Sequence, residues 1–130
     1  MQVLFILLFI PVVTSTYHTT DELLGKIKNE CEVVEDLSCR MEGDILIVDW
    51  KKNQPKNVVW AFNEHARERI TGELALEMIQ SLKEVKPGVR ITIVPVVNVW
   101  GRKRVDNGDR CLRKNKNGVD TNRNYPQKVR

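Results

Sequence analysis

The feature that most constrains the fold is a strand, helix and strand pattern between residues 58 and 97. The apolar run at residues 58–62 (VVWAF) has no polar interruption, which predicts a strand buried on both faces. A second β-rich run covers residues 90–97. Between them a helix is expected, with Thr71 as its cap, Pro87-Gly88 as its stop and an apolar stripe of Leu74, Ala75, Met78, Ile79 and Leu82. Two strands joined by such a helix pair in parallel through a right-handed crossover, so the sequence predicts an α/β fold.

The elements before this unit are shorter. Thr19 and Glu22 have the spacing of a capping box, which predicts a helix over residues 21–30. Two strands are expected over residues 32–40 and 44–50, joined by a turn. The chain has 130 residues, no internal repeat and no visible inner boundary, so one domain is expected.

The first residues resemble a targeting segment. An apolar run at residues 3–13 is too short to span a bilayer, and small residues follow it at 14–16. We therefore expect a signal peptide over residues 1–15, a mature chain that starts near Thr16, secretion, and no membrane association after cleavage. The alternative is a buried N-terminal strand or helix.

The chain has three cysteines, Cys31, Cys39 and Cys111. Their spacing matches no zinc ribbon and no CxxC motif, which argues against a cysteine metal site. In an oxidising compartment one disulfide is plausible, and the sequence leaves its pairing open.

Positive charge is concentrated at the end of the chain. Residues 100–130 hold ten Lys or Arg against three Asp, although the whole chain has a net charge of only +4. The excess predicts an anionic partner or, alternatively, a solvated tail. A nucleic-acid partner is disfavoured, because the segment at residues 111–126 offers only Tyr125 for base stacking.

Candidate chemistry follows the two strands of the parallel unit. Residues 63–68 and 98–104 come directly after them, and in open α/β sheets the binding crevice lies at that edge. His65 and Glu68 are three residues apart, so in a helical turn both could ligate one zinc ion. The alternative is a histidine at a helix start with a first-turn glutamate that the helix dipole favours.

A second group of polar residues lies in the turn-rich segment near the end. Arg113, Asn122 and Arg123 offer guanidinium and amide groups, which can hold a carboxylate in one orientation. The alternative is a solvated loop.

Together these segments resemble the zinc carboxypeptidase family of the pancreatic A/B type. The resemblance rests on residues 62–68 (FNEHARE), the helix that opens at Thr71, residues 118–124 (GVDTNRN) and the start at residues 17–19 (YHT). It runs from about Tyr17 to Pro126 and covers well under half of that family's domain. It implies part of a mixed, largely parallel sheet flanked by helices.

The resemblance also implies a site and an activity. A zinc ion activates a water that hydrolyses the C-terminal peptide bond of a peptide or protein. By position, the zinc ligands are His65 and Glu68, the catalytic arginine that stabilises the oxyanion is Arg113, the carboxylate is held by Asn122 and Arg123, and an accessory substrate contact is Arg67.

Departures from the family limit this expectation. Its third zinc ligand, its substrate-contacting tyrosine and its catalytic glutamate would lie beyond residue 130, so we expect residues 16–130 to be an N-terminal portion that is inactive alone. The alternative is a non-enzymatic fragment that binds peptide C-terminal carboxylates. Residues 98–101 (NVWG) replace the family's usual Asn-Pro-Asp-Gly turn.

Overall fold

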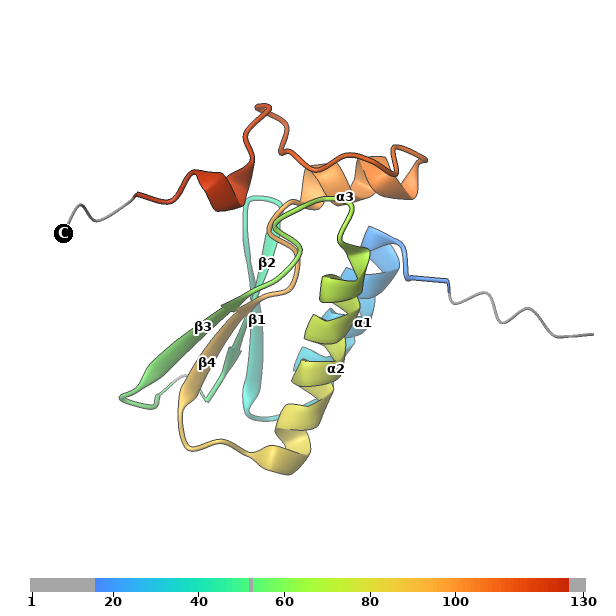
Figure 1. Cartoon of the computed structure of the whole chain (residues 1–130). Helices are drawn as coiled ribbons and strands as arrows, with labels where there is room; N and C mark the ends of the chain where they lie inside the picture. Colours follow the sequence, from blue (N-terminus) through green and yellow to red (C-terminus); the bar gives the residue numbers. More distant parts are fainter. Residues whose placement is uncertain (1–15, 52, 127–130) are drawn as a thin grey trace, which may run out of the picture.

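A computed structural model describes residues 16–51 and 53–126 of the chain. It contains one mixed four-stranded sheet with the order β1-β2-β4-β3, and two long helices, α1 and α2, that pack together on one of its faces (Figure 1). The expected α/β class is confirmed. The predicted signal peptide at residues 1–15 lies outside the described residues. Within the described residues no helix is long and apolar enough to cross a membrane.

Helix α1 (Thr20–Val33) begins as the sequence predicts. The Thr19 hydroxyl accepts from the Glu22 amide at 3.3 Å, and the Glu22 carboxylate accepts from the Thr19 amide at 2.8 Å. The helix continues to Val33, so the prediction that a strand starts at residue 32 was wrong. Its buried Leu23 and Ile27 lie one turn apart and face the sheet, and Cys31, one turn further along, also packs against this core.

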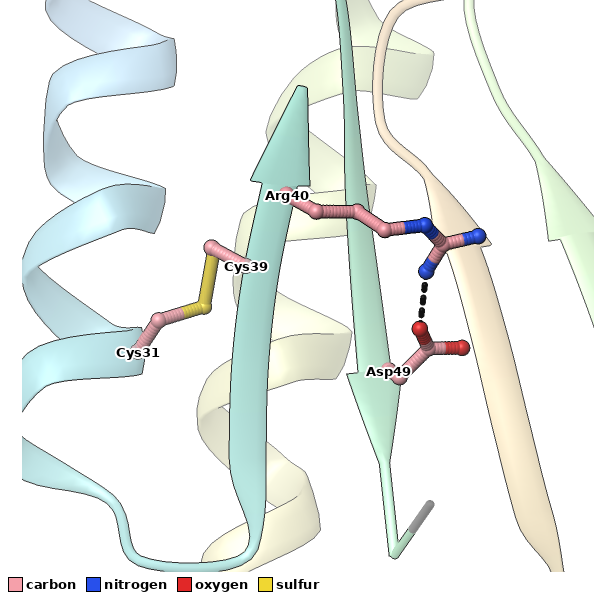
Figure 2. The surroundings of a disulfide bond; sticks show 4 residues. All are labelled: Cys31, Cys39, Arg40 and Asp49. Carbon is pink, nitrogen blue, oxygen red and sulfur yellow. Dashed lines mark hydrogen bonds and ion pairs between the residues drawn. A yellow bond between two sulfur atoms is a disulfide. The ribbon is translucent and has the colours of Figure 1, made fainter. Parts of the chain in front are cut away.

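Strands β1 (Leu37–Glu42) and β2 (Ile45–Trp50) form an antiparallel hairpin. Gly43 occupies its turn with a φ of 62°, a conformation that favours glycine. Cys39 of β1 is bonded to Cys31 of α1, which settles the pairing that the sequence left open, and Cys111 is a free, exposed thiol. Figure 2 shows this disulfide on the helix side of β1.

The opposite face of the hairpin carries a buried carboxylate. Asp49 of β2 is only 2% exposed. It accepts a hydrogen bond from the Thr92 hydroxyl at 2.7 Å and pairs with the guanidinium groups of Arg40 and Arg90 (Figure 2 shows the first). Burial acts to raise the pKa of Asp49, but the Thr92 hydrogen bond and the two arginines outweigh it and hold the pKa below its ordinary value.

Helix α2 (Arg69–Val85) begins three residues earlier than predicted. Glu68 is its N-cap residue and makes no side-chain cap, so the expected Thr71 cap was wrong. The Thr71 hydroxyl instead donates to the Glu68 carbonyl at 2.8 Å and accepts from the Asn63 amide at 3.0 Å. Leu74, placed by the pattern on the buried stripe, is half exposed. The face that packs on the core consists of Gly72, Ala75, Leu76, Ile79 and Leu82.

Strands β3 (Asn57–Ala61) and β4 (Arg90–Val94) pair in parallel, which confirms the expected crossover unit. Burial of β3 on both faces was wrong. It is the edge strand of the described sheet, and Val59 is 61% exposed. An apolar run identifies a strand but does not tell its place in the sheet. Here β4, which comes later in the chain, lies between β2 and β3 and leaves β3 at the edge.

One apolar core lies between the sheet and its two helices. It combines side chains of β2 and β4 with those of α1 and α2, and its largest fully buried member is Trp50. Beyond β4, where apolar residues are few and turn formers dominate, the sequence indicated no helix, but the structure has helix α3 (Val99–Asp106) and a short 3-10 helix, η1 (Thr121–Arg123). The Asn98 side chain caps α3 by accepting from the Gly101 amide at 3.0 Å.

Candidate metal centre

Two loops at the carboxyl ends of β3 and β4 build the candidate site. They run side by side, because the Val97 amide donates to the Phe62 carbonyl at 3.0 Å and the Asn98 amide to the Asn63 carbonyl at 3.1 Å. Both lie at the end of the sheet where α3 and the C-terminal segment pass (Figure 1). The sequence expectation that polar residues collect at this edge therefore agrees with the structure.

The first loop is rigidly shaped by Asn63. Its φ of 52° is left-handed, which few residues other than glycine adopt, and asparagine tolerates it better than most. The buried Asn63 amide group donates to the His65 carbonyl at 2.7 Å. Opposite it, Gly101 of α3 lies so close that an added Cβ would stand 2.7 Å from the Cβ of Ala66. The backbone on both sides of His65 is thus fixed by contacts.

His65 and Glu68 meet at the centre of the site. The Nδ1 atom of His65 lies 2.9 Å from Oε1 of Glu68, and Nε2 of the same ring lies 3.1 Å from Oδ1 of Asp120. The His65 side chain is 5% exposed and the Glu68 side chain 42%. If Nε2 donates its proton to Asp120, the Nδ1 lone pair and the Glu68 oxygen face each other as two acceptors. Such a pair requires a proton or a cation between them.

Arg113 lies on the same group. Its Nε donates to Oδ2 of Asp120 at 2.8 Å, its Nη1 is 3.5 Å from Oε1 of Glu68, and its Nη2 donates to Oδ1 of Asn122 at 3.2 Å. The Asp120 hydrogen bond raises the pKa of Arg113. In turn, the hydrogen bond from Arg113 lowers the pKa of Asp120 against the opposing effect of burial, with a smaller contribution from His65. Asp120 therefore stays ionised and can orient the imidazole.

Of the remaining predicted residues, Asn122 and Arg123 lie beside Arg113 and Arg67 does not. The exposed Arg123 donates through Nη1 to Oδ1 of Asn122 at 2.8 Å, which joins both to Arg113. Arg67 is exposed and lines a separate hollow of about 450 Å³ with Arg69 and Arg110. The structure thus brings together His65, Glu68, Arg113, Asn122 and Arg123 and leaves Arg67 apart from them.

Sequence reasoning missed the residues that hold this group in place. Asp120 stood within the motif at residues 118–124 but received no role, because its partner His65 is 55 residues away and no spacing reveals the contact. The hydroxyl of Tyr125 pairs with the Glu64 carboxylate, and this hydrogen bond raises the pKa of Tyr125. Thr121 donates to the Glu64 carbonyl at 3.0 Å. These contacts fasten the C-terminal segment to the first loop.

Comparison with known proteins agrees with this geometry. The sequence of residues 40–130 matches that of a known family, the zinc carboxypeptidases. The chain belongs to the zinc carboxypeptidase family. No curated protein matches it.

Solved structures show the same fold. Thrombin-activatable fibrinolysis inhibitor (TAFI) superposes with a TM-score of 0.75 at 26% identity, over 86% of this chain and 35% of its own. Bovine TAFI in complex with tick carboxypeptidase inhibitor gives 0.69 at 23% identity, over 77% and 37%. A candidate metallopeptidase from Shewanella amazonensis gives 0.62 at 17%, over 78% and 40%. This zinc carboxypeptidase chain therefore spans less than half the length of the structures that it matches.

Family membership implies Zn²⁺, and the residues present fit part of a zinc site. His65 and Glu68 are both zinc ligands by type, they face each other, and Asp120 holds the far nitrogen of the ring as a carboxylate behind a zinc-bound histidine does. Within residues 16–51 and 53–126 no third His, Cys, Asp or Glu joins them in a cluster suited to a metal ion. The described part of the zinc carboxypeptidase chain therefore offers two candidate ligands.

Proposed function

We propose that the chain carries the N-terminal part of a metallocarboxypeptidase active site, which hydrolyses the C-terminal peptide bond of proteins or peptides. The observation that carries the proposal is the pair His65 and Glu68, backed by Asp120 and adjacent to Arg113. His65 and Glu68 hold Zn²⁺. When bound, the ion supplies a Lewis acid next to the scissile carbonyl.

The chain's own residues bind and orient the substrate. Arg123 and Asn122 take the terminal carboxylate, since a guanidinium group binds it through two hydrogen bonds and the amide fixes its direction. Arg113 lies between this pair and Glu68, so its positive charge is available where negative charge develops on the carbonyl oxygen. Arg67 serves as an accessory contact for a more distant part of the peptide.

We propose further that the active site formed by this chain is incomplete. A catalytic zinc site uses three protein ligands, and hydrolysis also needs a base. We infer that the third ligand and the catalytic glutamate are supplied outside residues 1–130, and that this chain alone has negligible peptidase activity. Purified chain incubated with zinc and peptides should release no C-terminal residue, and sustained trimming would contradict this inference. The enzyme's place of action is proposed to be outside the cell or in the secretory lumen, in keeping with the Cys31–Cys39 disulfide.

Zinc titration tests the site without relying on turnover. Calorimetry on the full chain should show one zinc ion bound weakly, and His65→Ala or Glu68→Gln should abolish that binding. The matched control is His18→Gln, because His18 lies in a different cluster, beside Glu73. If His65→Ala binds zinc like the unaltered chain while His18→Gln loses it, the proposed centre is wrong.

A second candidate function is carboxylate binding without hydrolysis. It is favoured by Arg123, which is exposed and has no carboxylate partner among the described residues. Calorimetry with a peptide and its C-terminally amidated twin measures this directly. The free acid should bind better, and Arg123→Gln should remove the difference. Equal binding of acid and amide would exclude this function.

A further inference from the structure

The outward side of α3 carries a stripe that the candidate site does not use. Trp100, Lys103, Arg104 and Asn107 follow one another at helical spacing and are all exposed. The opposite side of the helix buries Val99, Arg102 and Val105. Trp100 stands where the resemblance places an aspartate of the family's usual turn, so its aromatic ring is a feature of this chain. An exposed ring on a helix that is already packed through its other face is available to a ligand.

Trp100 lies between two hollows. One, of about 480 Å³, is lined by the ring together with Lys103, Arg104, Asn107 and Asp109. The other, of about 230 Å³, is lined by the ring together with Asn115, Lys116, Asn117 and the carboxylate of Asp44. Both hollows are open to solvent and share the ring. An elongated ligand can therefore cross the indole and reach polar groups at either end.

The cations around the ring are weakly engaged. The Arg104 guanidinium lies 5.5 Å from the centre of the Trp100 ring and pairs with Asp109 at 3.1 Å, and Lys103 pairs with Asp21 at 2.8 Å. All four charged groups of these pairs are exposed, so each pair contributes little and exchanges readily for another anion. Lys116 has no carboxylate partner within the described residues.

We propose that this surface, formed by Trp100, Lys103, Arg104, Asn107 and Lys116, binds an acidic polysaccharide. A sugar ring stacks on the indole through its apolar face, the asparagine amides bind hydroxyl groups, and the cations bind sulfate or carboxylate groups. One aromatic ring between two hollows that each offer a cation, Lys103 and Arg104 in one and Lys116 in the other, fits a chain whose anionic groups repeat along its length.

Other polyanions fit this surface less well. Single-stranded nucleic acid needs several stacking rings in succession, and this surface has one. A membrane surface needs a broad apolar face, and Trp100 is the only large apolar side chain in the stripe. The concentration of Lys and Arg in residues 100–130 supplies the complementary charge for a sulfated chain.

Binding is measured on the full chain with a heparin octasaccharide, in EDTA so that the result is independent of the zinc site. Tryptophan fluorescence should change on binding, and the affinity should fall as salt rises. Trp100→Ala and Lys116→Gln should each weaken binding by roughly fivefold to tenfold. Lys26→Gln, an equal charge change on the exposed side of α1, should leave the affinity within about twofold.

Several results would overturn the proposal. The first is an equal loss in Lys26→Gln and Lys116→Gln, which would show unlocalised attraction. The second is unchanged affinity in Trp100→Ala, with Trp100→Phe as a variant that preserves an aromatic ring and the fold. The third is equal binding of fully desulfated octasaccharide, and the fourth is tighter binding to phosphatidylserine vesicles or single-stranded DNA. A melting curve for each variant confirms that only folded protein is compared.

Discussion

Two clusters of arginine, carboxylate and histidine lie near the start of α2, and they differ in how far their carboxylates are exposed to solvent. The first joins α1, α2 and α3 around Arg102, which is 0% exposed. Its Nη2 donates to the His18 carbonyl at 3.0 Å and to Glu73 at 3.3 Å. Nearby, Arg69 pairs with Asp106 at 3.2 Å. We call this the closed cluster.

The second is the candidate metal centre, where Glu68 remains 42% exposed and Arg123 faces solvent. In the closed cluster the charges are neutralised by one another and by backbone carbonyls of the segment before α1. In the candidate metal centre the same residue types leave the Glu68 carboxylate and the Arg123 guanidinium group accessible to solvent, while both ring nitrogens of His65 are engaged. Residue type therefore does not distinguish a structural cluster from a candidate site, whereas the exposure of the charged groups does.

The sharpest test of this contrast is the removal of Arg102. Burial lowers the pKa of its guanidinium, while Asp106 and Glu73 oppose that effect. Arg102→Ala leaves these carboxylates without their partner, so the free energy of unfolding should fall by about 3–5 kcal/mol. Urea unfolding measures it. Arg104→Ala, on the exposed side of the same helix, should change it by less than about 0.5 kcal/mol. Equal midpoints for the two variants would mean that the closed cluster is not structural.

Loss of the disulfide should affect stability and spare the metal centre. Cys31 and Cys39 are eight residues apart, and closing a loop of that length stabilises the fold by about 2.5 kcal/mol. The double change Cys31→Ser and Cys39→Ser should lower the unfolding free energy by that amount and leave zinc affinity within about twofold. Cys111→Ser, which removes the free thiol, is the control. A large loss of zinc binding in the double variant would show that the two regions are coupled.

Asp120→Asn should weaken zinc binding and spare stability, the reverse of what is expected for the disulfide variant. The carboxylate orients His65 from behind, so its loss should reduce zinc affinity by about 10–100-fold. Because Asp120 is partly exposed, the unfolding free energy should change little. Calorimetry with zinc and urea unfolding on the same sample give both numbers. Unchanged affinity with lowered stability would place Asp120 among the structural residues.

The smallest effect is expected at a partly exposed ion pair between Lys83 of α2 and Glu30 of α1. Hydrogen bonds from Lys83 and Gln80 hold the pKa of Glu30 below its ordinary 4.5, against the effect of burial. The pair therefore stabilises the fold above pH 4.5, and that contribution disappears as the pH falls through the lower pKa of the folded state. Lys83→Met should cost less than about 1 kcal/mol at pH 7 and less still at pH 3. If Lys83→Met costs more at pH 3 than at pH 7, the ionised Glu30 carboxylate is not what Lys83 stabilises.

Much of the fold was predictable because it depends on local patterns. The capping pair Thr19 and Glu22 and the parallel unit of β3, α2 and β4 follow from spacing alone. The edge position of β3 did not, since it depends on which strands flank it. The start of α2 was missed because tertiary contacts use the Thr71 hydroxyl to hold Asn63. Helix α3 was missed because its apolar content is low and its anchor is a buried arginine, which no hydrophobic pattern reveals.

The site was predictable in part for a related reason. His65 and Glu68 are near in sequence, so their spacing indicates one cation, and the family resemblance added Arg113. Asp120 meets His65 across 55 residues, and only the fold brings them together. The separation of Arg67 from the other residues is likewise a matter of side-chain direction.

The strand order β1-β2-β4-β3 has a consequence for how the protein is made. Strand β4 lies between β2 and β3 in the sheet and pairs with both, and it is the last of the four strands to leave the ribosome. During synthesis the hairpin and α1 can associate early, whereas β3 has no strand to pair with until residue 94 has emerged. The backbone groups of β3 are therefore unpaired, and open to chaperones or to other nascent chains, for the time that translation takes to pass through α2.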